Sequence, residues 1–319
     1  MAVSAGCGSG GAGSPPQASD PDITVAALPS DDLAGLYIAA DDGLFAQQGL
    51  RVTIVRIASS RAVIAAQLKG DVDVSAGSYV PYIAAQAAGA KFRILAEAST
   101  LRADTRVLVT TARSPVKSLA DLVGKKIGVN GTNSIGTLLI GMLLEENGIS
   151  PDKVHFMTDP AGFPSIPGQL QAGAWSAAFL AEPYVTIAEE DYGMQVVADL
   201  DQGATMNFPI DGYVVTQSWA KDHPGTAAAF TRAIEQGQSL ADVDPAVADA
   251  AMAKSDALPR SVTAVISLPG FPTGPVDDVR IQRVADSMLQ LGMLAGTDAS
   301  VVQSGSLVKS MIGSLAPQR

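Results

Sequence analysis

Short apolar runs alternate with longer amphipathic segments along most of the chain. Ten such runs are rich in Val, Ile, Leu, Ala and Phe, which is typical of strands buried on both faces of a sheet. They are ITVAAL (23–28), VTIVRI (52–57), VDVSA (72–76), FRILAEA (92–98), RVLVTT (106–111), KIGV (126–129), VHFMT (154–158), SAAFLA (176–181), MQVVADL (194–200) and YVVTQ (213–217).

Helices are predicted between these runs. After residue 134, apolar side chains recur with the 3.6-residue period of a helix, and Asn147-Gly148 is a typical helix end. Residues 114–124 are predicted as a capped helix, and the chain after residue 217 as helical to its end. Strands that alternate with helices indicate an α/β fold with largely parallel sheets covered on both faces.

The alternating pattern runs through the chain twice. We therefore predict two doubly wound α/β lobes joined by a two-segment hinge, with lobe 1 formed by 21–101 and 212–319 and lobe 2 by 102–211. The crossing segments are placed near Thr100–Asp104 and Pro209–Asp211. The carboxyl ends of the strands would then face a cleft between the lobes, where open α/β sheets bind their ligands.

Composition narrows the functional classes. The 319 residues are 47% apolar and 17% charged, with a formal net charge of −11, so a nucleic-acid partner is not expected. The single cysteine excludes an internal disulfide and a cysteine-based zinc site, and the two histidines are far apart in sequence. No apolar run reaches the ~18–20 residues that span a bilayer.

Residues 1–20 are rich in glycine and small polar residues and are predicted to form a flexible tether. Within them, the run SAGC ending at Cys7 resembles a bacterial lipoprotein cleavage site, which implies a lipid anchor on Cys7 and attachment to the outer face of the cell membrane. The alternative is a flexible tail that carries an incidental thiol.

Three polar clusters fall at predicted helix starts in the cleft: Ser59-Ser60, Ser78-Tyr79 and Thr132-Asn133-Ser134. Free amides at helix N-termini bind oxyanions, although the same residue types are also the usual helix caps. The full candidate set for solute binding is Ser30, Asp31, Tyr37, Ser59, Ser60, Ser78, Tyr79, Thr132, Asn133, Ser134, Phe163, Phe179, Glu182 and Asp211.

The charge of the solute is left open by these residues. Arg61, Arg102 and Arg106 could pair with an anionic head group, whereas Asp31, Asp211 and Glu182 could receive an amine or a ring N–H. Glu182 could equally hold the hinge by bonding backbone groups. The aromatic candidates could stack on an organic solute, although Phe179, within an apolar strand, fits the core as well.

Catalysis finds little support. The chain contains no G-x-S-x-G, H-E-x-x-H or Walker sequence, so we predict no enzymatic activity, no cofactor and no metal.

Four phrases carry a family resemblance: GLFAQQGL (43–50), LKGDVDV (68–74), SLADLVGKKIGV (118–129) and LQAGAWSAAFLAEPY (170–184). In order and spacing they resemble the solute-binding components of ABC importers, in particular the alkanesulfonate, nitrate and thiamine-precursor group. The resemblance implies the type II periplasmic-binding-protein fold. It also shows a departure, because Ser176 stands where this family usually carries an aspartate, next to the unusual Trp175.

The resemblance further implies an extracytoplasmic receptor, expected to be a monomer, that captures a small organic solute by hinge closure and delivers it to a membrane permease. A sulfonate- or carboxylate-like anion is the expected solute. The alternatives are a pyrimidine or thiamine-precursor binder, an enzyme on the same scaffold as in menaquinone-pathway proteins, and a sensor lobe of a signalling receptor.

Overall fold

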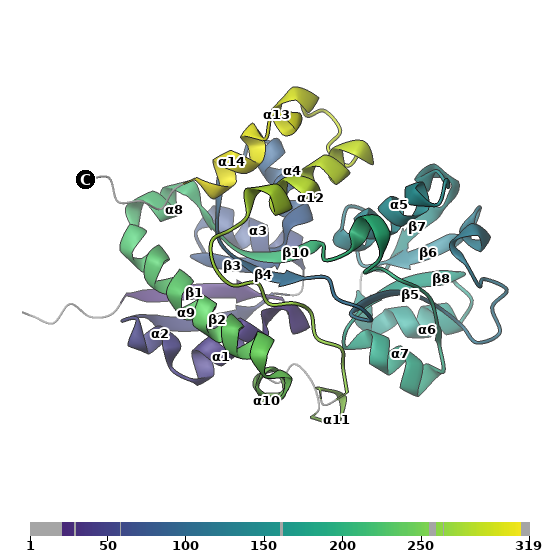
Figure 1. The fold of residues 1–319 in the computed structure, drawn as a ribbon, viewed down its shortest axis with the longest axis horizontal. Coiled ribbons are helices and arrows are strands. Elements are labelled where there is room, and N and C mark those ends of the chain that lie inside the picture. The colour runs from purple at the N-terminus through teal and green to yellow at the C-terminus, as the bar shows by residue number, and fades with distance from the viewer. Residues whose placement is uncertain are drawn as a thin grey trace, which may run out of the picture.

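Two five-stranded sheets lie side by side in the computed structural model, each flanked by helices (Figure 1). The model describes residues 21–28, 30–57, 59–159, 162–254, 260–263 and 265–313. The predicted tether and Cys7 lie outside these residues. Within the described ranges, no helix combines the length and apolar character that crossing a membrane requires.

The first sheet has the strand order β2-β1-β3-β10-β4. Its strands are β1 (Asp22–Ala27), β2 (Arg51–Arg56), β3 (Val74–Ser78), β4 (Phe92–Thr100) and β10 (Pro209–Thr216). Four strands share one direction, and β10 runs antiparallel between β3 and β4. The five strands predicted here are confirmed, and β10 begins before the predicted run because buried residues from Pro209 onward also pair.

The second sheet repeats this plan in the order β7-β6-β8-β5-β9. Its strands are β5 (Arg106–Thr110), β6 (Lys126–Val129), β7 (His155–Thr158), β8 (Ala177–Ala181) and β9 (Gln195–Asp199). Again the fourth strand, β5, runs antiparallel to its neighbours. The phrase at 68–74 leads into β3 and the phrase at 170–184 contains β8, and these are the central strands of the two sheets.

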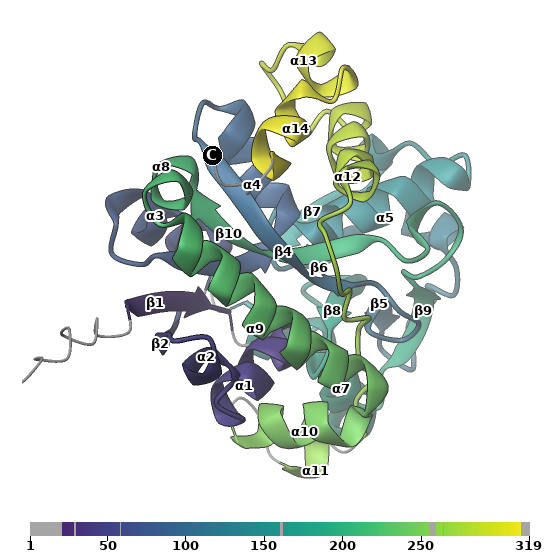
Figure 2. The ribbon, with the colours of Figure 1, turned by 60° about the vertical axis from the view of Figure 1, so that its left-hand side comes forward.

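Helices cover both sheets. They are α1 (Ala34–Asp41), α2 (Leu44–Gln47), α3 (Ser60–Lys69), α4 (Tyr79–Ala87), α5 (Ile135–Glu146), α6 (Ile166–Gln171), α7 (Tyr184–Tyr192), α8 (Gln217–Asp222), α9 (Pro224–Val243), α10 (Pro245–Lys254), α11 (Arg260–Thr263), α12 (Asp278–Gln290), α13 (Ala299–Gln303) and α14 (Ser306–Ile312). Single 3-10 turns are η1 (Asp31–Leu33), η2 (Leu119–Leu122), η3 (Pro151–Lys153), η4 (Phe163–Ser165) and η5 (Gly203–Thr205). Helix α9 runs across the first sheet (Figure 2).

Helices α1 and α9 approach closely through glycine. A Cβ on Gly237 would lie 2.2 Å from the carbonyl oxygen of Gly35, and a Cβ on Gly35 would collide with the side chain of Gln238. The contact fixes α1 against the long helix. Because η1 leads directly into α1, it also fixes the position of the acidic turn that follows β1.

Two helix predictions are wrong. Residues 114–124 contain only the 3-10 turn η2, because the Asp121 carboxylate accepts hydrogen bonds from the N–H groups of Lys117 and Ser118, which holds one local turn. The C-terminal part is also not continuously helical. Residues 265–277, called the connecting segment below, are irregular because prolines at 269, 272 and 275 cannot donate helix hydrogen bonds.

Three segments lie at the junction of the sheets. The two links between them, 101–105 and 200–208, are joined by a 2.8 Å hydrogen bond from the N–H of Leu101 to the carbonyl of Phe208. Gly270 of the connecting segment pairs with Thr100, the last residue of β4 before the first link. Figure 2 shows the segment passing close to this end of β4. The boundaries at 101/102 and 211/212 concern which parts of the chain move together as lobes, and they stay a prediction.

Candidate functional site

A buried ion pair joins the two sheets. Arg106, the first residue of β5, places Nη1 3.2 Å from Oδ2 of Asp31 and Nη2 2.5 Å from Oδ2 of Asp32. Both carboxylates belong to η1, which follows β1 of the other sheet. All three residues are almost fully buried. Because a buried charge is costly once it loses its partner, this contact couples the two sheets at the edge where the candidate cleft was predicted.

Two further carboxylates make this cluster acidic. Asp211 on β10 is buried within electrostatic reach of the ion pair, and Glu182 follows β8. Burial raises the pKa of Asp31 to about 7, against the opposing influence of Arg106. Burial and the nearby aspartates raise the pKa of Asp211 well above its ordinary value. Four carboxylates therefore lie within electrostatic reach of one guanidinium, which is bonded to two of them.

Glu182 holds backbone and hydroxyl groups. Its carboxylate accepts hydrogen bonds from the N–H (3.1 Å) and Oγ1 (2.9 Å) of Thr186 in the first turn of α7. It also accepts one from the N–H of Ser267 (3.3 Å) in the connecting segment. Burial raises the pKa of the Glu182 carboxyl, and these donors oppose the rise. The geometry matches the backbone-holding alternative, while contact with a solute stays a prediction.

The three predicted helix starts are confirmed, but their hydroxyls differ. Ser59 caps α3 by accepting a 3.3 Å bond from the N–H of Ala62, and Ser60 begins that helix. Ser134 precedes α5 and donates to Oδ1 of Asn130 (2.9 Å). The hydroxyl of Ser78, before α4, is buried and finds no hydrogen-bond partner in the described part of the chain.

The remaining candidates of the α5 loop, Thr132 and Asn133, are exposed. Ser30 lies inside the acidic cluster, where its hydroxyl donates to Oδ2 of Asp32 (2.5 Å). Asp32 itself was not among the predicted site residues. The consecutive aspartates directly after a strand were the available signal, because a strand end in this fold opens onto the cleft.

The aromatic candidates fall into two groups. Tyr37 on α1 and Tyr79 on α4 are buried beside the first sheet, and the Tyr79 ring packs against the backbone of Gly212 in β10. Beside the second sheet, the Phe163 ring in η4 contacts the rings of Phe179 (5.7 Å between ring centroids) and Tyr184 (5.8 Å).

Phe179 is fully buried directly beneath the first turn of α5. A Cβ on Gly136 would come within 2.5 Å of the Phe179 ring, which explains why glycine occupies this helical position. Trp175 similarly covers Gly128 of β6, and the neighbouring Ser176 contributes backbone bonds to Lys126 and Thr110. A solute contact for Phe179 stays a prediction.

The basic candidates are not gathered in one place. Arg106 is committed to Asp31 and Asp32, whereas Arg102 pairs with Asp242 (2.7 Å) at a partly exposed position. Arg61 is exposed on α3. Of the three basic candidates named from the sequence, Arg106 is therefore the one that supplies positive charge to the cluster at the junction.

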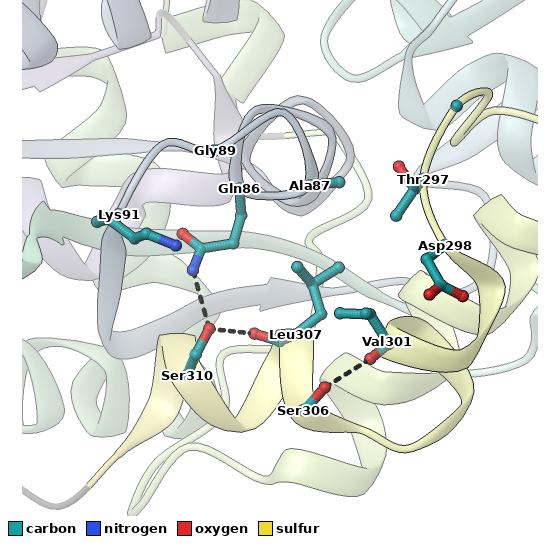
Figure 3. A pocket seen from close by; sticks show the side chains of 11 residues that line it. Gln86, Ala87, Gly89, Lys91, Thr297, Asp298, Val301, Ser306, Leu307 and Ser310 are labelled. Carbon is teal, nitrogen blue, oxygen red and sulfur yellow. Dashed lines mark hydrogen bonds between the residues drawn. The ribbon is translucent and has the colours of Figure 1, made fainter.

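A pocket of about 320 Å³ lies elsewhere, between α4 and the C-terminal helices α13 and α14 (Figure 3). Gln86 points toward Ser310 there and donates a 2.9 Å hydrogen bond to its hydroxyl. None of the predicted site residues lines this pocket. Within the residues that the structure describes, no group of three or more His, Cys, Asp or Glu side chains could hold a metal ion.

Comparisons with known proteins agree with this architecture. Residues 30–248, more than half of the chain, match the family model described as NMT1/THI5-like. The chain is 24% identical over 224 residues to the Bacillus subtilis binding protein YtlA. It is also 24% identical over 195 residues to an Escherichia coli aliphatic sulfonates-binding protein. These alignments cover 68% and 61% of this chain but 66% and 59% of the relatives, less than two thirds of their length.

Solved structures extend the likeness over nearly the whole chain. The periplasmic aliphatic sulphonate binding protein SsuA from Escherichia coli has a TM-score of 0.74 at 18% identity, covering 93% of this chain and 94% of its own. The periplasmic nitrate-binding protein NrtA from Synechocystis PCC 6803 has a TM-score of 0.72 at 14% identity, covering 92% of each chain. The chain therefore belongs to the NMT1/THI5-like family and has the two-sheet α/β fold of the periplasmic binding proteins.

Proposed function

We propose that this protein is an extracytoplasmic receptor of an ABC importer that captures a small organic solute between its two lobes. The observation that carries the proposal is the buried contact of Arg106 with Asp31 and Asp32, which brings residues of both sheets together at the strand ends. The sulfonate- and nitrate-binding relatives share this fold. The partner would be a membrane permease, with the receptor acting as a monomer.

Capture would proceed by hinge closure. The links 101–105 and 200–208 connect the two sheets. The connecting segment contacts both sheets, because Gly270 pairs with Thr100 of β4 and Ser267 donates to Glu182, which follows β8. A lobe rotation that separates Arg106 from the two aspartates would expose the cluster to solute. Binding would then shift the population toward the arrangement in which Arg106 contacts Asp31 and Asp32.

The candidate contacts are the polar and aromatic residues named from the sequence, with Ser30, Asp31, Ser78 and Asp211 at the junction. Location at the outer face of the cell membrane, with Cys7 as the lipid anchor, stays part of the proposal. The expectation of an anionic solute rests on the helix starts at Ser59 and Ser134.

A ligand screen combined with small-angle scattering tests the proposal. Sulfonates, aromatic acids, pyrimidines, amines and inorganic oxyanions are each added while thermal unfolding is recorded. A true solute at a hundredfold excess over its dissociation constant should stabilise the protein by about 3 kcal/mol. The same compound should reduce the radius of gyration, or leave it unchanged where the protein is already closed without solute. A protein that no compound stabilises or compacts would contradict the receptor role.

A further inference from the structure

The acidic cluster at the junction also indicates what chemistry the solute brings. Asp31, Asp32, Asp211 and Glu182 surround Arg106, whose guanidinium is bonded to the first two. Glu182 is satisfied by Thr186 and Ser267. No described residue donates a hydrogen bond to the side chain of Asp211, although it is only 4% exposed. Buried carboxylates of this kind require a donor or a counter-charge.

A second observation points to the same place. Ser78 lies directly opposite Asp211 in the antiparallel register of β3 and β10, so both side chains project from the same face of the sheet. Ser78 is 8% exposed, and its hydroxyl is buried and has no hydrogen-bond partner within the described ranges. Oδ1 of Asp32 likewise lacks a partner among these residues. Ser78 thus lies opposite Asp211, which interacts electrostatically with Asp32, and each of the three has a side-chain oxygen that receives no hydrogen bond from a described residue.

We propose that the solute carries a protonated amine, amidine or comparable N–H donor that binds Asp211, Ser78 and the free oxygen of Asp32. This inference rests on the proposed function. Such a group supplies the hydrogen-bond donors and the positive charge that the cluster lacks. An anionic group placed here would face four carboxylates. Any anionic part of the solute must therefore be directed away from β10.

Matched analogues test this inference. Primary amines, amidines and aminopyrimidines are screened beside counterparts in which the nitrogen is replaced by carboxylate, sulfonate or methyl. The compound that stabilises the native chain most is then titrated against Asp211→Asn and Ser78→Ala. We expect the nitrogen compound to bind, its methyl counterpart to bind at least about tenfold more weakly, and Asp211→Asn to lose at least about tenfold.

Asp152→Asn is the control, because it removes the same charge from an exposed turn of the second sheet and should leave affinity unchanged. Equal binding of the methyl counterpart, or an anion that binds more tightly to Asp211→Asn, would overturn the inference while the receptor role stands. The absence of any stabilising compound would overturn both. Urea unfolding of each variant verifies that affinity changes do not arise from loss of the fold.

Discussion

Arg106 and Asp32 are 74 positions apart in sequence and belong to different sheets, yet their side chains meet at 2.5 Å in a buried contact. Arg106 starts the strand that leaves the first link, and Asp32 lies in the turn after the first strand. The contact thus joins the strand after the first link to the turn that follows β1. Any motion of one sheet against the other must act on this ion pair.

Removal of the guanidinium should be strongly destabilising. Arg106→Met leaves Asp31 and Asp32 buried without their counter-charge, and we expect the free energy of unfolding to fall by about 3–5 kcal/mol in urea titrations. The triple variant that adds Asp31→Asn and Asp32→Asn should regain much of this loss. Arg51→Ala, which breaks the exposed ion pair with Asp22, is the control and should cost about 0–1 kcal/mol. A loss for Arg106→Met as small as that of the control would contradict the buried ion pair.

Stability should fall as the pH rises from about 4 to 7. The pKa of Asp31 is raised from 3.8 to about 7 by burial, so the folded state holds its proton more tightly than the unfolded chain. That contribution is fully present below pH 3.8 and is lost as the pH passes through 7. The raised pKa values of Asp211 and Glu182 act in the same direction.

Urea titrations at several pH values measure this effect, and Asp31→Asn should flatten the pH dependence. Asp121→Asn serves as a contrast. Hydrogen bonds from Lys117 and Ser118 lower the pKa of Asp121, so its own contribution is present at neutral pH and lost in acid. An unchanged slope in Asp31→Asn would show that other groups control the titration.

A methyl group at Gly136 should disturb the start of α5. Its Cβ would collide with the Phe179 ring at 2.5 Å, so Gly136→Ala should lose about 1–3 kcal/mol of stability. Phe179→Leu combined with Gly136→Ala should recover part of it by making space. Gly168→Ala in α6 meets nothing within 4 Å and should be neutral or gain about 0.5–1 kcal/mol. Equal effects of the two single variants, measured by thermal unfolding, would exclude the predicted collision.

Loss of the Glu182 carboxylate should loosen the connecting segment. Glu182→Ala removes the acceptor for Ser267 and for Thr186, and we expect about 1–3 kcal/mol of destabilisation with faster amide exchange in 265–277. Glu190→Ala on the exposed side of α7 is the matched control. Unchanged exchange at Ser267 in the Glu182 variant would mean that this carboxylate does not hold the segment.

Much of the fold could be predicted because its strands are short, apolar and separated by clear turns. The antiparallel strands β10 and β5 could not be oriented from their own residues, since an apolar run reads the same in either direction; pairing with distant strands decides it. The helix expected at 114–124 failed because one carboxylate, Asp121, satisfies local N–H groups in a single turn. The prolines at 269, 272 and 275 were visible signals of the connecting segment.

The candidate site was predicted less completely than the fold. Asp31, Asp211, Glu182 and Arg106 were named from the sequence, but their assembly into one cluster depends on contacts between positions far apart along the chain. The same limit applies to hydroxyls. Sequence patterns mark Ser59 and Ser78 alike as helix starts, and tertiary packing leaves one as a cap and the other without a partner.

The place of β10 between β3 and β4 has a consequence for synthesis on the ribosome. Residues 22–100 supply four strands of the first sheet, but the position between β3 and β4 stays empty until residues 209–216 emerge. The second sheet, by contrast, is encoded without interruption between residues 106 and 199. A growing chain can therefore complete its second sheet before its first, while β3 and β4 keep edges that pair only when β10 arrives.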